Sequence, residues 1–214
     1  MVLDFLKIAS VIAPTAMPED LFKDCLLLAN AEYKNIIENV RNWIDFTSRF
    51  YAYSFFDKDD SGENFNIHDM VKRYLLFRLN NNILNIIDAL SITLDKKFLP
   101  PNSYNRLEID SFFNHVRSFL EYYENKQIGS SSTKLFETFS TANLCNNYAK
   151  CCELSGKYRK ALKYYEFAKL IYEKINANKN TLGAIYNNLG LINSKLGKNT
   201  ESMNFYKKAL DCYE

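Results

Sequence analysis

Glycine and proline are scarce in this sequence, which contains six of the first and four of the second in 214 residues. Proteins made of many short β-strands use these residues in their frequent turns, so the scarcity disfavours such a fold. Hydrophobic residues make up 47% of the chain, which is enough apolar surface to bury a core. The composition therefore predicts a globular all-α protein of one or two domains.

The cysteines lack any spacing typical of a metal site. There are five of them, an odd number, and no two form a CxxC pair. The apolar run from Ile8 to Ala16 makes a poor signal peptide, because Asp4 precedes Lys7 and Pro14 interrupts the run. We therefore predict an intracellular protein in a reducing, cytoplasmic compartment, with association with the cytoskeleton as a further expectation.

Long apolar runs, a large net charge and catalytic motifs are also missing. No stretch approaches the ~20 apolar residues that a membrane-spanning helix needs. A net charge of +2 gives no overall attraction to nucleic acid. The two histidines, His68 and His115, lie far apart, and no GxxxxGK or GxGxxG phosphate loop occurs. We therefore predict no membrane insertion, no nucleic-acid partner, no enzymatic activity and no cofactor.

What the chain does have is helical periodicity throughout residues 1–126. The predicted helical segments are 1–16, 21–56 with a break near Asn30, 67–79, 83–90 and 108–124. The single tryptophan, Trp43, falls on the apolar stripe and is predicted to lie in the core. The small polar residues 127–133 (QIGSSST) predict a linker to a second domain, 134–214.

The last third of the chain contains one helix–turn–helix pattern twice. Gly156 recurs as Gly197 and Ala168 recurs as Ala209, each pair 41 residues apart. Glycine at this place suits a left-handed turn between two antiparallel helices. The predicted helices are 134–154, 158–176, 180–196 and 199–213.

This spacing resembles the tetratricopeptide repeat, in which small residues let two helices touch and aromatic residues fill the gaps beside them. The second copy carries the resemblance best, in AIYNNLGLINSKLGKNTESMNFYKKALDCYE, and the long period is similar to that of kinesin light chain repeats. The resemblance implies a short α-solenoid that binds other proteins, as a scaffold or as a structural subunit of a stable multi-subunit complex.

In that family the first helix of each repeat lines a groove for a bound segment. The resemblance implies that the groove residues here are Asn146, Asn147, Lys150, Asn187, Asn188, Leu191 and Lys195. Asparagine suits this task because its amide offers a donor and an acceptor to a peptide group, and the two lysines add attraction to an acidic partner. The alternative is that the asparagines are ordinary polar surface in an asparagine-rich chain.

Two repeats are too few to cover both ends of a solenoid, which generally needs ~3 units. The last predicted helix therefore leaves an uncovered array end, made of Met203, Tyr206, Leu210 and Tyr213. We expect a partner protein or further repeats beyond Glu214 to cover this end.

An acidic turn interrupts the N-terminal region. The sequence YSFFDKDDSGENFNIHDMV resembles an EF-hand loop, since oxygen-bearing residues alternate before a glycine. The calcium ligands that the resemblance implies are Asp57, Asp59, Ser61, Glu63 and Asp69. A second loop at Asp95 lacks ligands, so a degenerate EF-hand-like pair and a plain polar connection between helices are the alternatives. With calcium bound, the protein would be a calcium-responsive regulator whose output is the repeats.

Overall fold

The structure is a computed structural model that describes residues 1–12, 14–52, 56–60, 62–79, 84–98, 106–127 and 137–214. The chain divides into two compact units, one of residues 1–94 and 114–129 and one of residues 95–113 and 130–214. The division falls within two helices, α6 (Leu84–Lys97) and α7 (Arg106–Gln127). Apart from Gln127, the linker predicted at 127–133 lies outside the described residues, so the domain boundaries stay a prediction.

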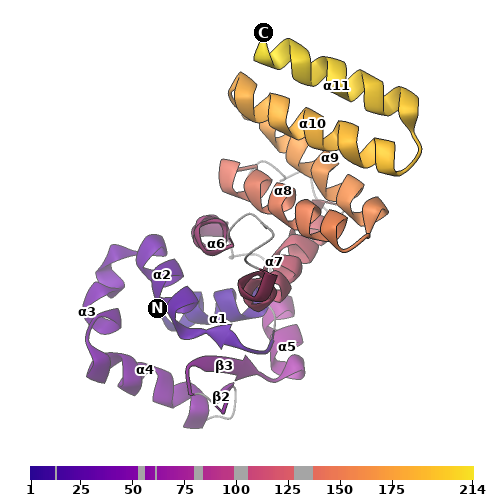
Figure 1. Ribbon diagram of the computed structural model, residues 1–214. Coiled ribbons are helices and arrows are strands. Elements are labelled where there is room, and N and C mark those ends of the chain that lie inside the picture. Colours follow the sequence, from indigo (N-terminus) through magenta and orange to yellow (C-terminus); the bar gives the residue numbers. More distant parts are fainter. Residues whose placement is uncertain (13, 53–55, 61, 80–83, 99–105, 128–136) are drawn as a thin grey trace. The chain divides into compact units, whose positions relative to one another are not determined.

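The N-terminal unit is helical, as predicted, with one small sheet (Figure 1). Its elements before α6 are α1 (Val2–Val11), β1 (Met17–Pro18), α2 (Glu19–Ala29), η1 (Ala31–Tyr33), α3 (Lys34–Ile37), α4 (Val40–Ala52), β2 (Phe56–Lys58), β3 (Asn64–Ile67) and α5 (Asp69–Leu79). The predicted break near Asn30 is confirmed, because Asn30 is extended and its side chain accepts a hydrogen bond from the backbone N–H of Glu32.

An aromatic cluster around Phe5 forms the core of this unit. Phe5 lies on α1 and is 1% exposed. Its ring contacts six others at centroid distances between 4.4 and 6.3 Å, from Phe22, Trp43, Phe46, Phe50, Phe56 and Phe65. Aromatic side chains bury the most apolar area per residue, so one helix can hold several segments together. The predicted core position of Trp43 is therefore confirmed.

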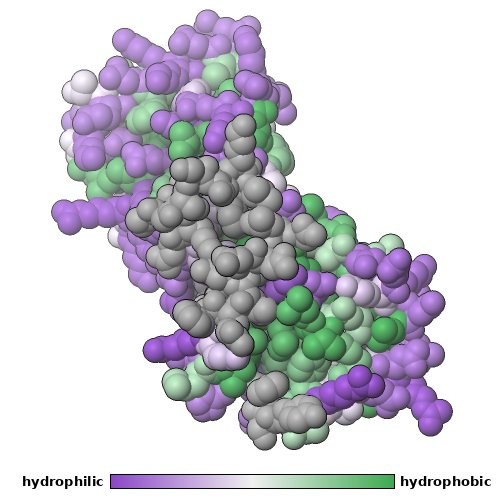
Figure 2. Space-filling model, turned by 180° about the vertical axis from the view of Figure 1, so that it is seen from behind, coloured by the Kyte–Doolittle hydropathy of each residue, from purple (hydrophilic) through white to green (hydrophobic). Residues whose placement is uncertain are grey.

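The surface of the same unit retains apolar side chains. Seen from behind, it presents a hydrophobic area next to hydrophilic residues (Figure 2). Its exposed large apolar residues are Val2, Leu3, Leu28, Val40, Ile44, Met70 and Tyr74. None of the helices in the described part of the chain combines the length and apolarity needed to cross a bilayer.

A three-stranded antiparallel sheet occupies the place of the acidic turn. The strand order is β1-β3-β2, with Met17 opposite Phe65 and Phe56 opposite Ile67. The sequence interpretation did not foresee these strands and placed Ile67 in a helix. The signal was present, because Asn64–Ile67 alternates polar and apolar residues and its apolar members are buried.

Four helices form the repeat part of the second unit, and they match the predicted ranges closely. They are α8 (Phe139–Leu154), α9 (Tyr158–Lys174), α10 (Lys179–Lys195) and α11 (Asn199–Tyr213) (Figure 1). Contacts join α8 to α9, α9 to α10 and α10 to α11. The helical-repeat fold predicted from the 41-residue spacing is confirmed.

The three turns between these helices share one hydrogen-bond pattern. Gly156, Asn176 and Gly197 are left-handed, with φ of 73°, 52° and 74°. In each turn this residue and the next donate backbone hydrogen bonds to carbonyls three and five residues earlier, as in a Schellman motif. The two glycines were predicted from the sequence. Asn176 was not, because asparagine is only one of the L-residues that tolerate this conformation.

Histidine 115 makes the stability of the N-terminal unit depend on pH. The side chain is 1% exposed and its Nε2 donates to the carbonyl oxygen of Ala16 at 2.9 Å. Burial lowers its pKa below the ordinary 6.5, and nearby Lys72 lowers it further, although the Ala16 hydrogen bond opposes them. The unfolded chain therefore binds more protons than the folded one, and stability falls as the pH drops below about 6.5.

We expect His115→Gln to lower the free energy of unfolding at pH 7 by about 1–3 kcal/mol, through loss of a buried hydrogen bond. It should also reduce the fall in stability between pH 7 and pH 5.5, measured by urea denaturation. The same exchange at His68, which is exposed, is the matched control and should leave the wild-type dependence of the unfolding free energy on pH unchanged. An equal fall in unfolding free energy between pH 7 and pH 5.5 in the wild type and in His115→Gln would contradict the assignment of this pH dependence to His115.

Candidate functional site

One face of the repeats is formed by side chains from α8 and α10. Residues three and four apart lie on one side of a helix. Asn143, Asn146 and Lys150 therefore share a face of α8. By the same spacing, Ala184, Asn188, Leu191 and Lys195 share a face of α10.

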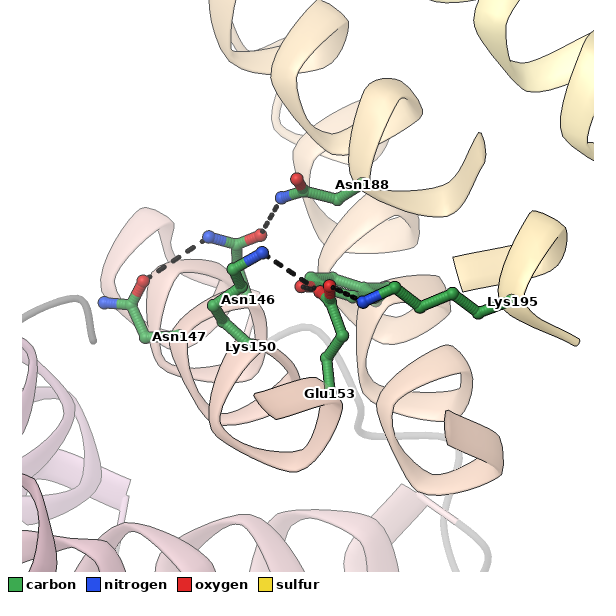
Figure 3. Close-up of polar contacts among 7 residues, drawn as sticks. Asn146, Asn147, Lys150, Glu153, Asn188 and Lys195 are labelled. Atoms are coloured by element: carbon green, nitrogen blue, oxygen red, sulfur yellow. Dashed lines mark hydrogen bonds and ion pairs between the residues drawn. The ribbon is translucent and has the colours of Figure 1, made fainter. Parts of the chain in front are cut away.

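The asparagines of this face are joined across the two helices. Asn188 Nδ2 donates to Asn146 Oδ1 at 3.0 Å, and Asn146 Nδ2 donates to Asn147 Oδ1 at 3.4 Å (Figure 3). The structure thus brings together three of the four predicted asparagines. Asn187 is exposed and Leu191 is half-buried, and neither belongs to this network.

A buried carboxylate that the sequence interpretation missed lies beside them. Glu153 is 3% exposed. It accepts hydrogen bonds from Lys150 at 3.2 Å, from Lys195 at 2.8 Å and from the hydroxyl of Tyr165 at 2.9 Å. The predicted groove lysines are therefore paired with one residue (Figure 3). The available signal was that Glu153 is the one acidic residue in α8, three positions after Lys150.

These contacts keep Glu153 ionised. Burial alone would raise its pKa, but the hydrogen bonds from Lys195, Tyr165 and Lys150 outweigh burial and hold the pKa below the ordinary value. The hydrogen bond to Glu153 raises the pKa of Lys195 in turn. Two ammonium groups and one carboxylate leave a net charge of +1 in this cluster at neutral pH.

A cleft lies between the first halves of α8 and α10. Its volume is about 300 Å³, and it is lined by Phe139, Asn143, Asn146, Tyr172, Asn180, Thr181, Ala184 and Ile185. At its base the Tyr172 hydroxyl donates to Asn143 Oδ1, and Asn143 Nδ2 donates to Asp95 at 3.0 Å. The predicted groove residue Asn146 thus lines the cleft and also makes the bridge to Asn188.

The residues of the predicted array end on α11 differ in how far they are exposed and in whether they pack on α10. Met203 and Leu210 are 59% and 57% exposed and form what we call the outer face of α11, and Tyr213 is 56% exposed. Tyr206 is half-buried. The Tyr206 ring lies where a side chain at Gly190 would be, since a Cβ there would come within 2.6 Å of it. The Tyr213 ring covers Gly183 in the same way, at 2.7 Å.

The acidic turn is a β-hairpin, which differs from the helix–loop–helix of an EF-hand. Asp59 closes it, because its carboxylate accepts hydrogen bonds from the backbone N–H of Asn64 at 3.3 Å and from its Nδ2 at 2.6 Å. Asp57 is exposed in β2, and Asp69 pairs with Arg73 at 2.7 Å on α5.

Ser61 and Glu63 are the other two predicted calcium ligands. Ser61 lies outside the described residues, and the side chain of Glu63 is exposed. Within the described ranges no three His, Cys, Asp or Glu side chains are grouped so that they could hold a metal ion. Calcium binding stays a prediction.

We expect Asp59→Ala to lower the unfolding free energy by about 1–2 kcal/mol with calcium chelated, because the hairpin loses two hydrogen bonds. Asp57→Ala removes an exposed carboxylate of the same turn and should stay within about 0.5 kcal/mol of the wild type. Urea denaturation in chelator and in millimolar calcium checks both values. A stabilisation of the wild type by calcium that both variants lose would instead establish a calcium site.

We expect Glu153→Gln to lower the unfolding free energy at pH 7 by about 1–3 kcal/mol, since two ammonium groups lose their charged partner. The pKa of Glu153 is lowered in the folded state, so its contribution is present above the unfolded value of 4.5 and is lost as the pH falls through the folded value. The difference from the wild type should therefore shrink below pH 4.5. Glu166→Gln, an exposed exchange on α9, is the matched control. A constant difference down to pH 3 would refute this role.

Comparison with known proteins addresses the second unit. Residues 138–214 match a family model described as tetratricopeptide repeat. No curated protein and no solved structure gives a match. The matched range covers α8 to α11, with their shared turns and the close approach of helices at Gly183 and Gly190. The C-terminal region of this chain, residues 138–214, thus matches the tetratricopeptide repeat family and has the helical-repeat fold expected of it.

Proposed function

We propose that this protein is a non-catalytic scaffold, or a structural subunit of a larger assembly, that holds partner proteins through α8 to α11. Tetratricopeptide repeats generally mediate protein–protein interactions, which supports protein as the class of partner. The observation that carries the proposal is the exposure of the outer face of α11.

Equivalent positions in the two repeats differ in burial. Tyr165 and Tyr172 on α9 are 0% and 3% exposed. Their counterparts 41 residues later on α11 are Tyr206, which is half-buried, and Tyr213, which is 56% exposed. The same repeat position is thus interior on α9 and accessible on α11. Clustered exposed apolar side chains of this kind typically mark an interaction surface.

The proposed assembly is cytoplasmic, and its association with the cytoskeleton is open to test. None of the five cysteines forms a disulfide, and four of them are buried. Burial raises the pKa of the Cys152 thiol, which disfavours the reactive thiolate. Buried thiols without disulfides fit a structural protein in a reducing compartment better than a thiol enzyme.

The test compares two double variants of the tagged full chain expressed in its native source. Met203→Gln with Leu210→Gln makes the outer face of α11 polar. Met70→Gln with Leu28→Gln makes the same two exchanges at exposed positions of the N-terminal unit, where the side chains are 69% and 47% exposed. We expect the first variant to lose at least ten-fold of the co-purifying partner, measured by quantitative mass spectrometry, and the second to retain it.

Both variants should keep the wild-type melting temperature, because all four positions are exposed. Light scattering on the purified wild type should show a mass above that of one chain when the partner is present. A wild-type chain that purifies alone as a monomer would contradict the assembly. If both variants retained the partner equally, the outer face of α11 would not be part of the surface that binds the partner.

A further inference from the structure

The two ends of the repeat array differ in how far they are covered. Figure 1 shows α8 and α11 as the first and last helices of the stack. On α8 only the first and last residues, Phe139 and Leu154, are exposed. The ring of Phe113, which belongs to the same unit, stacks on that of Tyr148 at a centroid distance of 4.9 Å. The chain's own residues therefore cover the α8 end of the array.

The α11 end is open on the side where the array would take another helix. Met203 and Leu210 on α11 are exposed. The residues 41 positions earlier, Leu162 and Lys169 on α9, are both half-buried, and α9 packs against α10. The outer face of α11 thus has the repeat position that is covered by a neighbouring helix on α9.

One open end and one covered end restrict how copies of this chain can associate. Head-to-tail stacking needs two different complementary surfaces and builds open filaments. The covered α8 end offers no such second surface to α11. A surface that pairs with its own copy about a two-fold axis needs only itself, and it closes at two chains. The array therefore favours a two-fold contact between two copies of α11.

The outer face carries one unpaired charge of each sign beside it. Lys207 and Asp211 lie one turn apart on α11 and are both exposed. Within the described part of the chain neither of them forms an ion pair. Lys208 differs, because its ammonium group lies over the rings of Tyr186 and Phe205 at 5.7 and 5.9 Å. Lys207 and Asp211 are therefore both available to a second chain.

These charges complement each other in an antiparallel pair of α11 helices. With the two-fold axis level with Ala209, Lys207 of one copy lies opposite Asp211 of the other, and the symmetry forms this pair twice. The two Leu210 residues are then offset by about 3 Å along the helices, at 1.5 Å per residue, so they can pack together. An axis between Tyr206 and Lys207 would instead bring the two Lys207 side chains together, which like charge disfavours.

We propose that the partner on the outer face of α11 is a second copy of this chain, in an antiparallel two-fold dimer in which Leu210 packs on Leu210 and Lys207 pairs with Asp211. This inference rests on the proposed function, because it names the partner of the surface assigned there. One helix from each copy makes a small contact, so we expect a Kd of about 1–100 µM.

The first test measures the purified full chain by sedimentation equilibrium from about 1 to 500 µM, a range chosen to span this Kd. We expect a single monomer–dimer equilibrium without larger species. A chain that stays monomeric throughout would overturn the proposal. Species that keep growing with concentration would also overturn it, because they require a second contact surface.

The second test exchanges the two charges. Lys207→Glu and Asp211→Lys should each weaken self-association at least ten-fold, because each puts like charges opposite one another. A mixture of the two variants should associate within three-fold of the wild type, because both pairs between the two chains are again of opposite charge. The loss in Lys207→Glu should be smaller in about 0.5 M salt than in about 50 mM salt.

The matched control repeats these exchanges in the N-terminal unit. Lys34 and Glu38 have the same four-residue spacing, and their side chains are 65% and 59% exposed. Lys34→Glu and Glu38→Lys should leave self-association unchanged, and all four variants should keep the wild-type melting temperature. Wild-type association in Lys207→Glu, or a mixture no stronger than either variant alone, would refute the proposed contact.

The outcomes separate this proposal from the proposed function. A wild type that stays monomeric, while Met203→Gln with Leu210→Gln loses a different co-purifying protein, would keep the assembly function and overturn the dimer. Charge exchanges that behave as expected, with every other protein retained by that variant, would establish the dimer and leave no other protein on the outer face of α11.

Discussion

The repeat unit depends on one buried carboxylate that three successive helices share. Glu153 belongs to α8, and it accepts hydrogen bonds from Tyr165 on α9 and from Lys195 on α10. A charge removed from water is costly unless it is paired and hydrogen-bonded, so the carboxylate strongly favours the arrangement in which all three donors reach it. This contact therefore links α8 to both α9 and α10.

The same constraint explains the exposed lysines. An arrangement with one carboxylate and one lysine would be neutral, but Lys150 also reaches Glu153 from the preceding turn of α8. Both lysine side chains remain about one-third exposed while the carboxylate is almost fully covered. The structural ion pair thus leaves two partly exposed ammonium groups over a covered carboxylate.

The architecture of the repeats was predictable from sequence because it depends on local signals. Gly156 and Gly197 mark turns that favour glycine, and the repeat of 41 residues aligned the helices. Glu153 was not predictable in this way, since nothing in a helical sequence states that a charged residue is buried; that follows from Tyr165 and Lys195, 12 and 42 residues away. The groove was identified only through family resemblance, which gave Asn146 and Asn188 but not the pocket that Asn146 lines.

The hairpin at the acidic turn was missed for a different reason. Its strands are three and four residues long, which is shorter than the window in which alternation stands out. The acidic residues that suggested a calcium loop include Asp59, and its carboxylate is used within the turn to hold Asn64. Turn-forming and metal-binding sequences use the same short acidic residues, so only the geometry distinguishes them.

The helix α10 is held by contacts on two of its sides. One side of this helix packs on α11, where Gly183 and Gly190 leave room for the rings of Tyr213 and Tyr206 and the Ser202 hydroxyl donates to the Gly190 carbonyl. Its other side carries Asn188 and Lys195. Close packing against glycine leaves no space for α10 to shift relative to α11, and Glu153 fixes it relative to α8. Contacts on both sides therefore hold α10 within the array that α8 to α11 form.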